Sequence, residues 1–250
     1  MLFLLVVVYK NLSPIMDAVI VYNPKGGVGK SMVCSTVYQY LLDHNTPFIA
    51  FDTDRNNPDC YRRYKDLLPV KLAIFSEANK YEDAANSLFN EAMNNLVVVN
   101  MPAQVHQPFK DWLEKNEILE IAPEVGVRFH LWFVTDSGFD SLNLLQKTLE
   151  LYQDKMRYTI VRNFGRSEEF DAFEQHEAIQ KLLKTLQATV IDFPVLNGSM
   201  VRHRLDSESL SYGVALARED FGIIEKQRIR KFLRESYAAF AKTEVFAHVN

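Results

Sequence analysis

The stretch Asn23-Pro24-Lys25-Gly26-Gly27-Val28-Gly29-Lys30-Ser31 decides the fold of this 250-residue chain. It follows an apolar, β-branched run at residues 18–22 and precedes a helix expected over residues 30–43. Glycines let successive backbone N–H groups face one anion, and the start of the helix adds its positive dipole end. The segment 26–31 matches the end of a P-loop, so we expect Lys30 to reach nucleotide phosphates and Ser31 to bind Mg²⁺.

Short apolar runs alternate with helical patterns along the rest of the chain. We expect strands at residues 18–22, 48–51, 71–75, 96–99, 128–134, 157–161 and 189–193. We expect helices at residues 30–43, 58–64, 79–93, 107–119, 141–152, 169–186 and 221–242. This alternation predicts an α/β fold of three layers, α/β/α, with a mostly parallel sheet of seven or eight strands. Ligands of such sheets bind at the carboxyl ends of the strands.

The composition narrows the class of protein. Hydrophobic residues make up 48% of the chain and charged residues 24%, which excludes a disordered chain. We find no repeat and no linker, so residues 16–250 are expected to form a single domain that contains the P-loop. The net charge of −4 means that any contact with DNA must come from a local basic patch. The two cysteines, Cys34 and Cys60, fit a reducing cytoplasm rather than a disulfide framework.

Residues 1–15 are treated as an N-terminal extension. The apolar run at residues 1–9 is too short for a membrane helix and lacks the features of a signal peptide, so no stable membrane insertion is expected. We interpret it as either an additional strand or a start-site artefact, since Met16 offers a second plausible start.

The complete loop, in which Lys25 precedes Lys30 by five residues, resembles the deviant Walker A motif of the ParA/MinD family of P-loop ATPases. The resemblance implies ATP and Mg²⁺ as cofactors and an ATP-dependent homodimer in which Lys25 touches the partner's nucleotide. A cation supplied by a partner stabilises transition-state charge, as an arginine finger does. The implied nucleotide-binding residues are Lys25, Gly26, Gly27, Val28, Gly29, Lys30, Ser31, Met32, Asn163 and Pro194.

Polar residues that follow two other strands extend the implied site. The resemblance implies that Asp54 orients the attacking water and that Asp52 lies near the Mg²⁺. The implied catalytic residues are Lys25, Lys30 and Asp54. The family ends its Walker B strand in Asp, whereas this chain has Asn100, whose neutral carbonyl should hold Mg²⁺ less strongly. The metal set is therefore Ser31, Asp52 and Asn100, and hydrolysis is expected to be slow.

Three further segments fit the same resemblance. Residues 102–104 would form the switch that senses the γ-phosphate. The resemblance implies that Asn163 bonds adenine and that the loop at Pro194 covers the base. Asp136 is a weaker candidate for a substitute carboxylate.

Several segments of the chain, the loop among them, look like the conjugal-transfer and mobilisation branch, TraL and MobD. They comprise residues 25–32, 38–40, 51–54 and 215–233. The resemblance implies a switch in plasmid partition, positioning or conjugal transfer that acts with a partner protein. Nonspecific DNA is a further candidate partner, through basic clusters at residues 62–65, 202–204 and 228–234.

Two alternatives remain open at this stage. Asn100 also suits a nucleotide-binding adaptor with little or no hydrolysis. A metabolic P-loop kinase or ligase would need a small-molecule pocket facing the γ-phosphate, and we find no motif for one.

Overall fold

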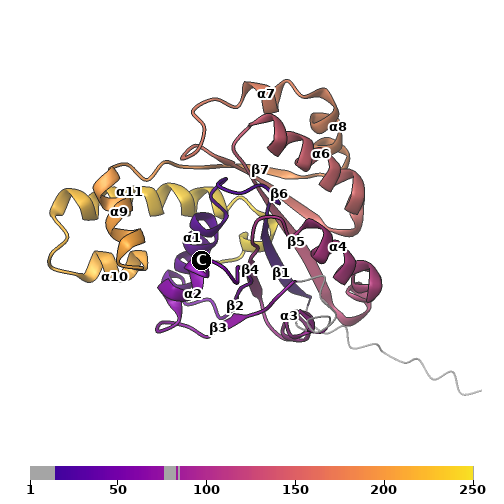
Figure 1. The fold of residues 1–250 in the computed structure, drawn as a ribbon, viewed down its shortest axis with the longest axis horizontal. Coiled ribbons are helices and arrows are strands. Elements are labelled where there is room, and N and C mark those ends of the chain that lie inside the picture. Colours follow the sequence, from indigo (N-terminus) through magenta and orange to yellow (C-terminus); the bar gives the residue numbers. More distant parts are fainter. Residues whose placement is uncertain (1–14, 76–82, 84, 250) are drawn as a thin grey trace, which may run out of the picture.

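A seven-stranded sheet, parallel throughout, forms the centre of the molecule (Figure 1). The computed structural model describes residues 15–75, 83 and 85–249, so the expectations for residues 1–14 and for the start of the helix at 79–93 lie outside the described residues. The strand order is β3-β2-β4-β1-β5-β6-β7. The strands are β1 (Met16–Tyr22), β2 (Ile49–Asp52), β3 (Val70–Leu72), β4 (Val97–Asn100), β5 (Val127–Thr135), β6 (Arg157–Asn163) and β7 (Thr189–Phe193).

Helices cover both faces of this sheet, as the alternating pattern predicts. One face carries α3 (Asn86–Ala92), α4 (His106–Lys115), α5 (Ile118–Ile121), α6 (Phe139–Tyr152), α7 (Asp171–Glu174) and α8 (Glu177–Thr185). The other carries α1 (Lys30–Asp43), α2 (Asp59–Tyr64), α9 (Ser199–Ser207), α10 (Tyr212–Ala217) and α11 (Ile223–Phe240). Strand β1 sends Ile20 and Tyr22 to the first core and Val19 and Val21 to the second, because successive side chains of a strand alternate. The predicted three-layer fold is therefore confirmed.

Several expected elements differ at their ends. The helix expected at 169–186 is divided into α7 and α8, because the His176 side chain accepts a hydrogen bond from the Ile179 N–H and starts a new helix. The helix expected at 107–119 is interrupted at Glu117, whose φ of 48° is left-handed. Strand β3 is shorter than expected and begins one residue earlier.

Helices α9 and α10 are absent from the sequence-based expectation, which treated residues 202–204 only as a basic cluster. Both are short, and Ser211 caps the start of α10, because its hydroxyl accepts a hydrogen bond from the Val214 N–H. Together with the first half of α11 they project beyond the sheet (Figure 1). These helices matter for function because α9 lines the cavity described below.

The second half of α11 anchors this projecting part to the sheet. Phe240 is fully buried, and its ring lies 5.3 Å from that of Trp132, 5.8 Å from that of Tyr40 and 6.2 Å from that of Phe193, centroid to centroid. These rings come from β5, α1 and β7, so one side chain joins three elements.

We predict that Phe240→Ala lowers the free energy of unfolding by about 3–5 kcal/mol, because the lost ring leaves a cavity among aromatic neighbours. The control is Ile223→Ala on the same helix, where the side chain is 80% exposed and the change should stay within about 0.5 kcal/mol. Chemical denaturation measures both. A loss below about 1 kcal/mol for Phe240→Ala would show that α11 is not anchored by this ring.

Candidate functional site

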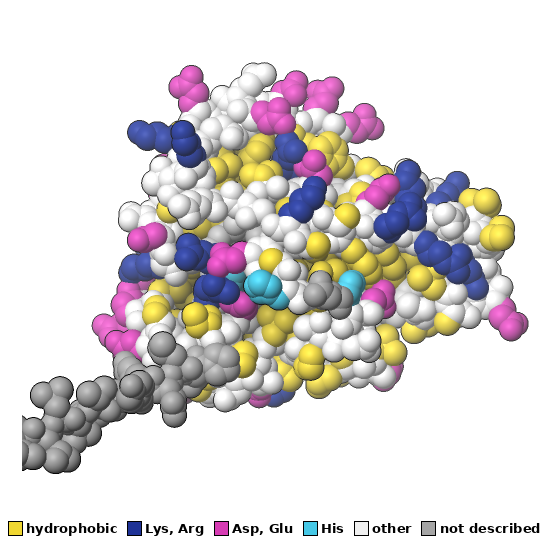
Figure 2. All heavy atoms as spheres, turned by 180° about the vertical axis from the view of Figure 1, so that it is seen from behind, with side chains coloured by type: hydrophobic (Ala, Val, Ile, Leu, Met, Phe, Trp, Pro, Cys, Tyr) yellow, Lys and Arg dark blue, Asp and Glu magenta, His cyan; other side chains and the backbone are white. Residues whose placement is uncertain are grey.

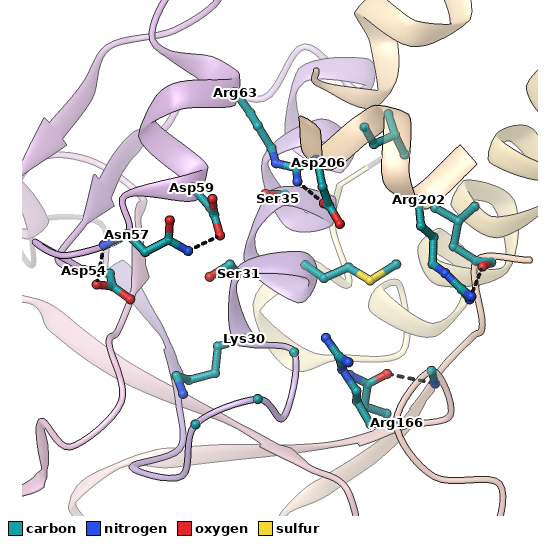
Figure 3. A pocket seen from close by; sticks show the side chains of 18 of the residues that line it. Lys30, Ser31, Ser35, Asp54, Asn57, Asp59, Arg63, Arg166, Arg202 and Asp206 are labelled. Atoms are coloured by element: carbon teal, nitrogen blue, oxygen red, sulfur yellow. Dashed lines mark hydrogen bonds and ion pairs between the residues drawn. The ribbon is translucent and has the colours of Figure 1, made fainter. Parts of the chain in front are cut away.

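The carboxyl ends of the strands open onto a cavity of about 790 Å³ (Figure 3). The loop after β1 forms one wall, Asp54 follows β2, and Asn163 ends β6. Helices α2 and α9 close the cavity on the side away from the loop. A volume of this size accommodates a nucleotide-sized ligand. The structure thus places the cavity at the strand ends where the sequence predicts function.

The loop itself has the conformation that a phosphate nest requires. Gly27 and Gly29 have φ values of 77° and 97°, in the left-handed region that favours glycine. Gly29 precedes the first turn of α1, so the free N–H groups of that helix face the cavity side of the loop. The Lys30 Nζ donates a 2.8 Å hydrogen bond to the Lys25 carbonyl, which holds the side chain back across the loop.

Burial lowers the pKa of Lys30 to about 8, although the Asp54 carboxylate acts in the opposite direction. The lysine is thus largely protonated at neutral pH but holds its proton weakly. A bound triphosphate would restore the proton affinity by adding negative charge nearby.

The Lys25 side chain, unlike that of Lys30, is directed away from the cavity toward Asp136. Its Nζ forms a 2.8 Å ion pair with Asp136, which follows β5, and neither side chain lines the cavity among the residues described. Partial burial of Asp136 acts to raise its pKa, but the hydrogen bonds from Lys25 and the Gly138 N–H outweigh it, and the pKa lies below its ordinary value. Asp136 is therefore the ion-pair partner of Lys25 in this structure.

A buried polar network lies behind Ser31. Asn100 donates from Nδ2 to Asp52 Oδ1 at 3.0 Å and to Ser31 Oγ at 3.4 Å. Asp52 also accepts from the backbone N–H groups of Tyr61 and Asp54. Burial raises the pKa of Asp52, and these hydrogen bonds partly offset the rise. Of the predicted metal set, only Ser31 lines the cavity.

The residues present fit a Mg²⁺ ion that takes most of its ligands from phosphates and water. No group of three His, Cys, Asp or Glu side chains within the described ranges could hold a metal alone. Ser31 offers a hydroxyl at the cavity wall, and the buried Oδ1 of Asn100 has no hydrogen-bond partner in the described part of the chain. Protein sites usually bind Mg²⁺ through few side chains together with substrate phosphates.

Asp54 reaches the cavity from the loop after β2 (Figure 3). Its Oδ1 accepts hydrogen bonds from the backbone N–H groups of Asn56 and Asn57, at 3.1 and 3.0 Å. The side chain is therefore held at the cavity wall, and its other oxygen is not engaged by these donors.

Asn163 connects the loop to β6. Its Nδ2 donates to the Val28 carbonyl at 2.7 Å, and its Oδ1 accepts from the Gly165 N–H at 3.0 Å. One N–H and one lone pair of this amide remain for a ligand. The predicted contact of Asn163 with adenine stays a prediction, and the structure adds a role in holding the loop.

Some of the predicted binding residues line the cavity, some do not, and further residues line it that were not predicted. Among the predicted binding residues, those that line it are Gly26, Gly27, Gly29, Lys30, Ser31, Met32 and Asn163. Val28 lies in the core instead, and Pro194 is not among the lining residues, whereas Leu196 is. Sequence reasoning missed Leu196, Arg166, Leu205 and Asp206, and it assigned Arg202 only to a basic cluster for DNA. No motif placed the α9 residues at the cavity, because α9 reaches it only through tertiary packing.

An ion pair between Arg63 of α2 and Asp206 of α9 bridges the far side of the cavity (Figure 3). Arg63 also donates to the Leu210 carbonyl at 3.2 Å. These contacts join α9 and the segment that follows it to α2 at the cavity.

Comparison with solved structures identifies the fold. A chain of the MinC:MinD cell division protein complex from Aquifex aeolicus aligns with a TM-score of 0.52 and 13% identity, over 87% of this chain and 94% of that one. A ParA family ATPase from Chlorobium tepidum TLS aligns with a TM-score of 0.50 and 12% identity, over 89% and 99%. The chain has the fold of the ParA/MinD P-loop ATPases.

Sequence relatives of this ParA/MinD-type chain are distant. It is 24% identical to protein MobD of Acidithiobacillus ferrooxidans over 196 residues, which cover 77% of this chain and 83% of MobD. It is 25% identical to protein TraL of Escherichia coli over 222 residues, which cover 84% and 91%. No family model matches the chain. The expected relation to the conjugation and mobilisation branch is confirmed as distant homology.

We predict that affinity for ATP falls about 30-fold between about pH 7 and pH 9.5. In the free protein, Lys30 loses its proton as the pH rises through about 8. In the complex, the negative charge of the triphosphate keeps Lys30 protonated. Binding in this range should therefore take up a proton. Calorimetry in buffers of different ionisation enthalpy measures both the affinity and the uptake.

Lys30→Arg is the control, because arginine stays protonated over this range and should remove the pH dependence of whatever affinity remains. A wild-type affinity that is constant across the range would contradict the account of Lys30.

Proposed function

We propose that this chain is a ParA-like ATPase switch. ATP and Mg²⁺ bind in the cavity, two copies close around the nucleotides, and slow hydrolysis opens them again. The switch would serve plasmid partition, positioning or conjugal transfer, together with a partner protein. Distant homology to MobD and TraL supports this setting, and the glycine loop with its two lysines supports the chemistry.

One observation carries the proposal: one lysine of the loop lines the cavity, and the other lies outside it. Lys30 lines the cavity of its own chain, whereas Lys25 is held outside that cavity by Asp136. The Lys25 side chain keeps 30% of its surface exposed, so it can reach another molecule once the ion pair opens. A lysine in this position suits phosphates that a second copy presents.

Within the proposed site, each side chain has a distinct task. Lys30 would contact the phosphates at the far end of the nucleotide, and Ser31 would be a Mg²⁺ ligand. Asp54 would orient the attacking water, because its carboxylate is held at the cavity wall. Phosphoryl transfer depends chiefly on such placement and on charge stabilisation.

A second candidate function is a nucleotide-binding adaptor with little or no hydrolysis. The observation that favours it is the neutral Asn100 at the end of β4, beside Asp52 and Ser31. A carboxylate at this position would add one negative charge to the metal site, and the amide does not.

If this chain binds nonspecific DNA, the basic residues of α11 are the best candidates for the contact. In the cluster at residues 62–65, Arg62 is paired with Asp59 and Arg63 with Asp206. In the cluster at residues 202–204, Arg204 is paired with three carboxylates. On α11, by contrast, the exposed Arg228, Arg230 and Arg234 have no carboxylate partner in the described chain. Figure 2 shows basic side chains gathered at the end of the molecule where α9 to α11 project.

No helix among the described residues is both long and apolar enough to cross a lipid bilayer. We propose a cytoplasmic location, which agrees with the two free, buried cysteines.

We predict that ATP with Mg²⁺ shifts the wild-type chain from monomer to dimer in sedimentation velocity. Lys30→Ala should abolish ATP binding, because it removes the cation at the nest. Lys25→Ala should bind ATP within about 3-fold of wild type yet stay monomeric, because Lys25 lies outside its own cavity.

Wild-type affinity for ATP in Lys30→Ala would contradict nucleotide binding at this loop. Normal dimer formation by Lys25→Ala would contradict the role of Lys25 across the interface.

We predict that Asn100→Asp raises ATP turnover if the missing carboxylate limits hydrolysis. Without Mg²⁺ the variant should lose about 1–3 kcal/mol of stability, because it removes the donor to Asp52 and sets two buried carboxyls together. Mg²⁺ with nucleotide should restore part of this loss. Asn100→Ala is the control that removes the donor without adding a carboxyl. Turnover equal to wild type in Asn100→Asp would show that this position does not limit hydrolysis.

A further inference from the structure

Arg166 enters the cavity from a tight turn after β6. The Gly165 N–H donates to Asn163 Oδ1 at 3.0 Å, and the Arg166 N–H donates to the Asn163 carbonyl at 2.9 Å. This turn directs the arginine back over the end of its own strand. Its side chain is exposed and lines the cavity (Figure 3).

The Arg166 guanidinium lies beside the start of α1. Its Nε is 3.8 Å from the position that a Cβ on Gly29 would occupy. Gly29 caps α1, so the guanidinium lies next to the free N–H groups of the first helical turn. Figure 3 shows Arg166 on the opposite side of the loop's glycines from Lys30. The loop therefore has a cation at each end.

The other cations at the cavity or near the loop are already engaged. Lys25, outside the cavity, is paired with Asp136, and Arg63 is paired with Asp206. Arg202 donates to the Leu196 carbonyl at 3.0 Å and comes from α9, not from the strand ends. The Lys30 Nζ donates a 2.8 Å hydrogen bond to the Lys25 carbonyl. Arg166, by contrast, has no carboxylate partner among the residues that the structure describes.

We propose that Arg166 binds the phosphates of the nucleotide at the end nearest the nucleoside. This inference rests on the proposed nucleotide binding and adds a third cation to it, one that the motif does not contain. A guanidinium forms paired, charge-assisted hydrogen bonds with phosphate oxygens and stays charged at every physiological pH. The contact precedes the γ-phosphate, so it serves ADP and ATP alike and leaves selection between them to Lys30 and Lys25.

The test compares Arg166→Gln and Arg166→Lys by calorimetry with ADP and with ATP. Gln keeps most of the side-chain size without the charge, and Lys restores the charge. Removing a hydrogen bond to a charged group should weaken both nucleotides about 10- to 100-fold in Arg166→Gln. Arg166→Lys should recover part of that loss. The salt dependence of binding should also be smaller in Arg166→Gln, because one screened charge pair is lost.

Arg157→Gln is the matched control, since Arg157 begins the same strand at its opposite end. It should bind both nucleotides as wild type does. Adenosine, used as a competitor, separates a phosphate contact from a contact with the base. A loss in Arg166→Gln that extends equally to adenosine would overturn the phosphate assignment.

Two further outcomes are decisive. Wild-type affinity for ADP and ATP in Arg166→Gln would overturn the role of Arg166 and leave nucleotide binding intact. If the wild-type chain binds neither nucleotide, the proposed function fails, and the role of Arg166 fails with it.

Discussion

The phosphate loop keeps its shape because groups outside it hold its backbone. Asn163 donates to the Val28 carbonyl, and its amide nitrogen lies where a Cβ on Gly29 would collide. On the other side, Asn23 accepts from the Lys25 N–H and donates to the Val134 carbonyl and to Ser141. The Gln104 N–H donates to the Pro24 carbonyl. The residues that hold the loop thus lie on β4, β5 and β6 or on the segments that follow these strands. They reach the loop only because the parallel sheet brings the ends of these strands beside the end of β1.

The charges around this loop follow from the same arrangement. The end of β5 supplies Asp136, which holds Lys25 outward, and the turn after β6 supplies Arg166, which lies inward. Behind Ser31, the amide of Asn100 occupies the space between two oxygens, so the metal side carries one charge fewer than a carboxylate would give. If the proposed function holds, cations are available for a triphosphate, while the metal side lacks one carboxylate. This combination would favour slow hydrolysis.

The sheet and the loop could be predicted from the sequence because both depend on local signals. Short β-branched runs mark buried strands, and the glycines with Lys30 and Ser31 mark the nest. The sequence could not predict α9 as a wall, because its contact with α2 depends on the Arg63–Asp206 pair, 143 residues apart. Arg166 was missed for a similar reason, since only the turn around Asn163 brings it to Gly29. The pairing of Lys25 with Asp136 likewise joins the ends of two strands that are adjacent only in the folded sheet.

A crystal structure with Mg²⁺ and a non-hydrolysable ATP analogue tests the central claim most directly, that this cavity is a nucleotide site shared between two copies. The account predicts phosphates against the N–H groups of residues 26–31, with two copies facing each other. It also predicts Lys25 released from Asp136 and directed at the partner's phosphates. A nucleotide bound away from the loop, or a dimer in which Lys25 remains paired with Asp136, would contradict it.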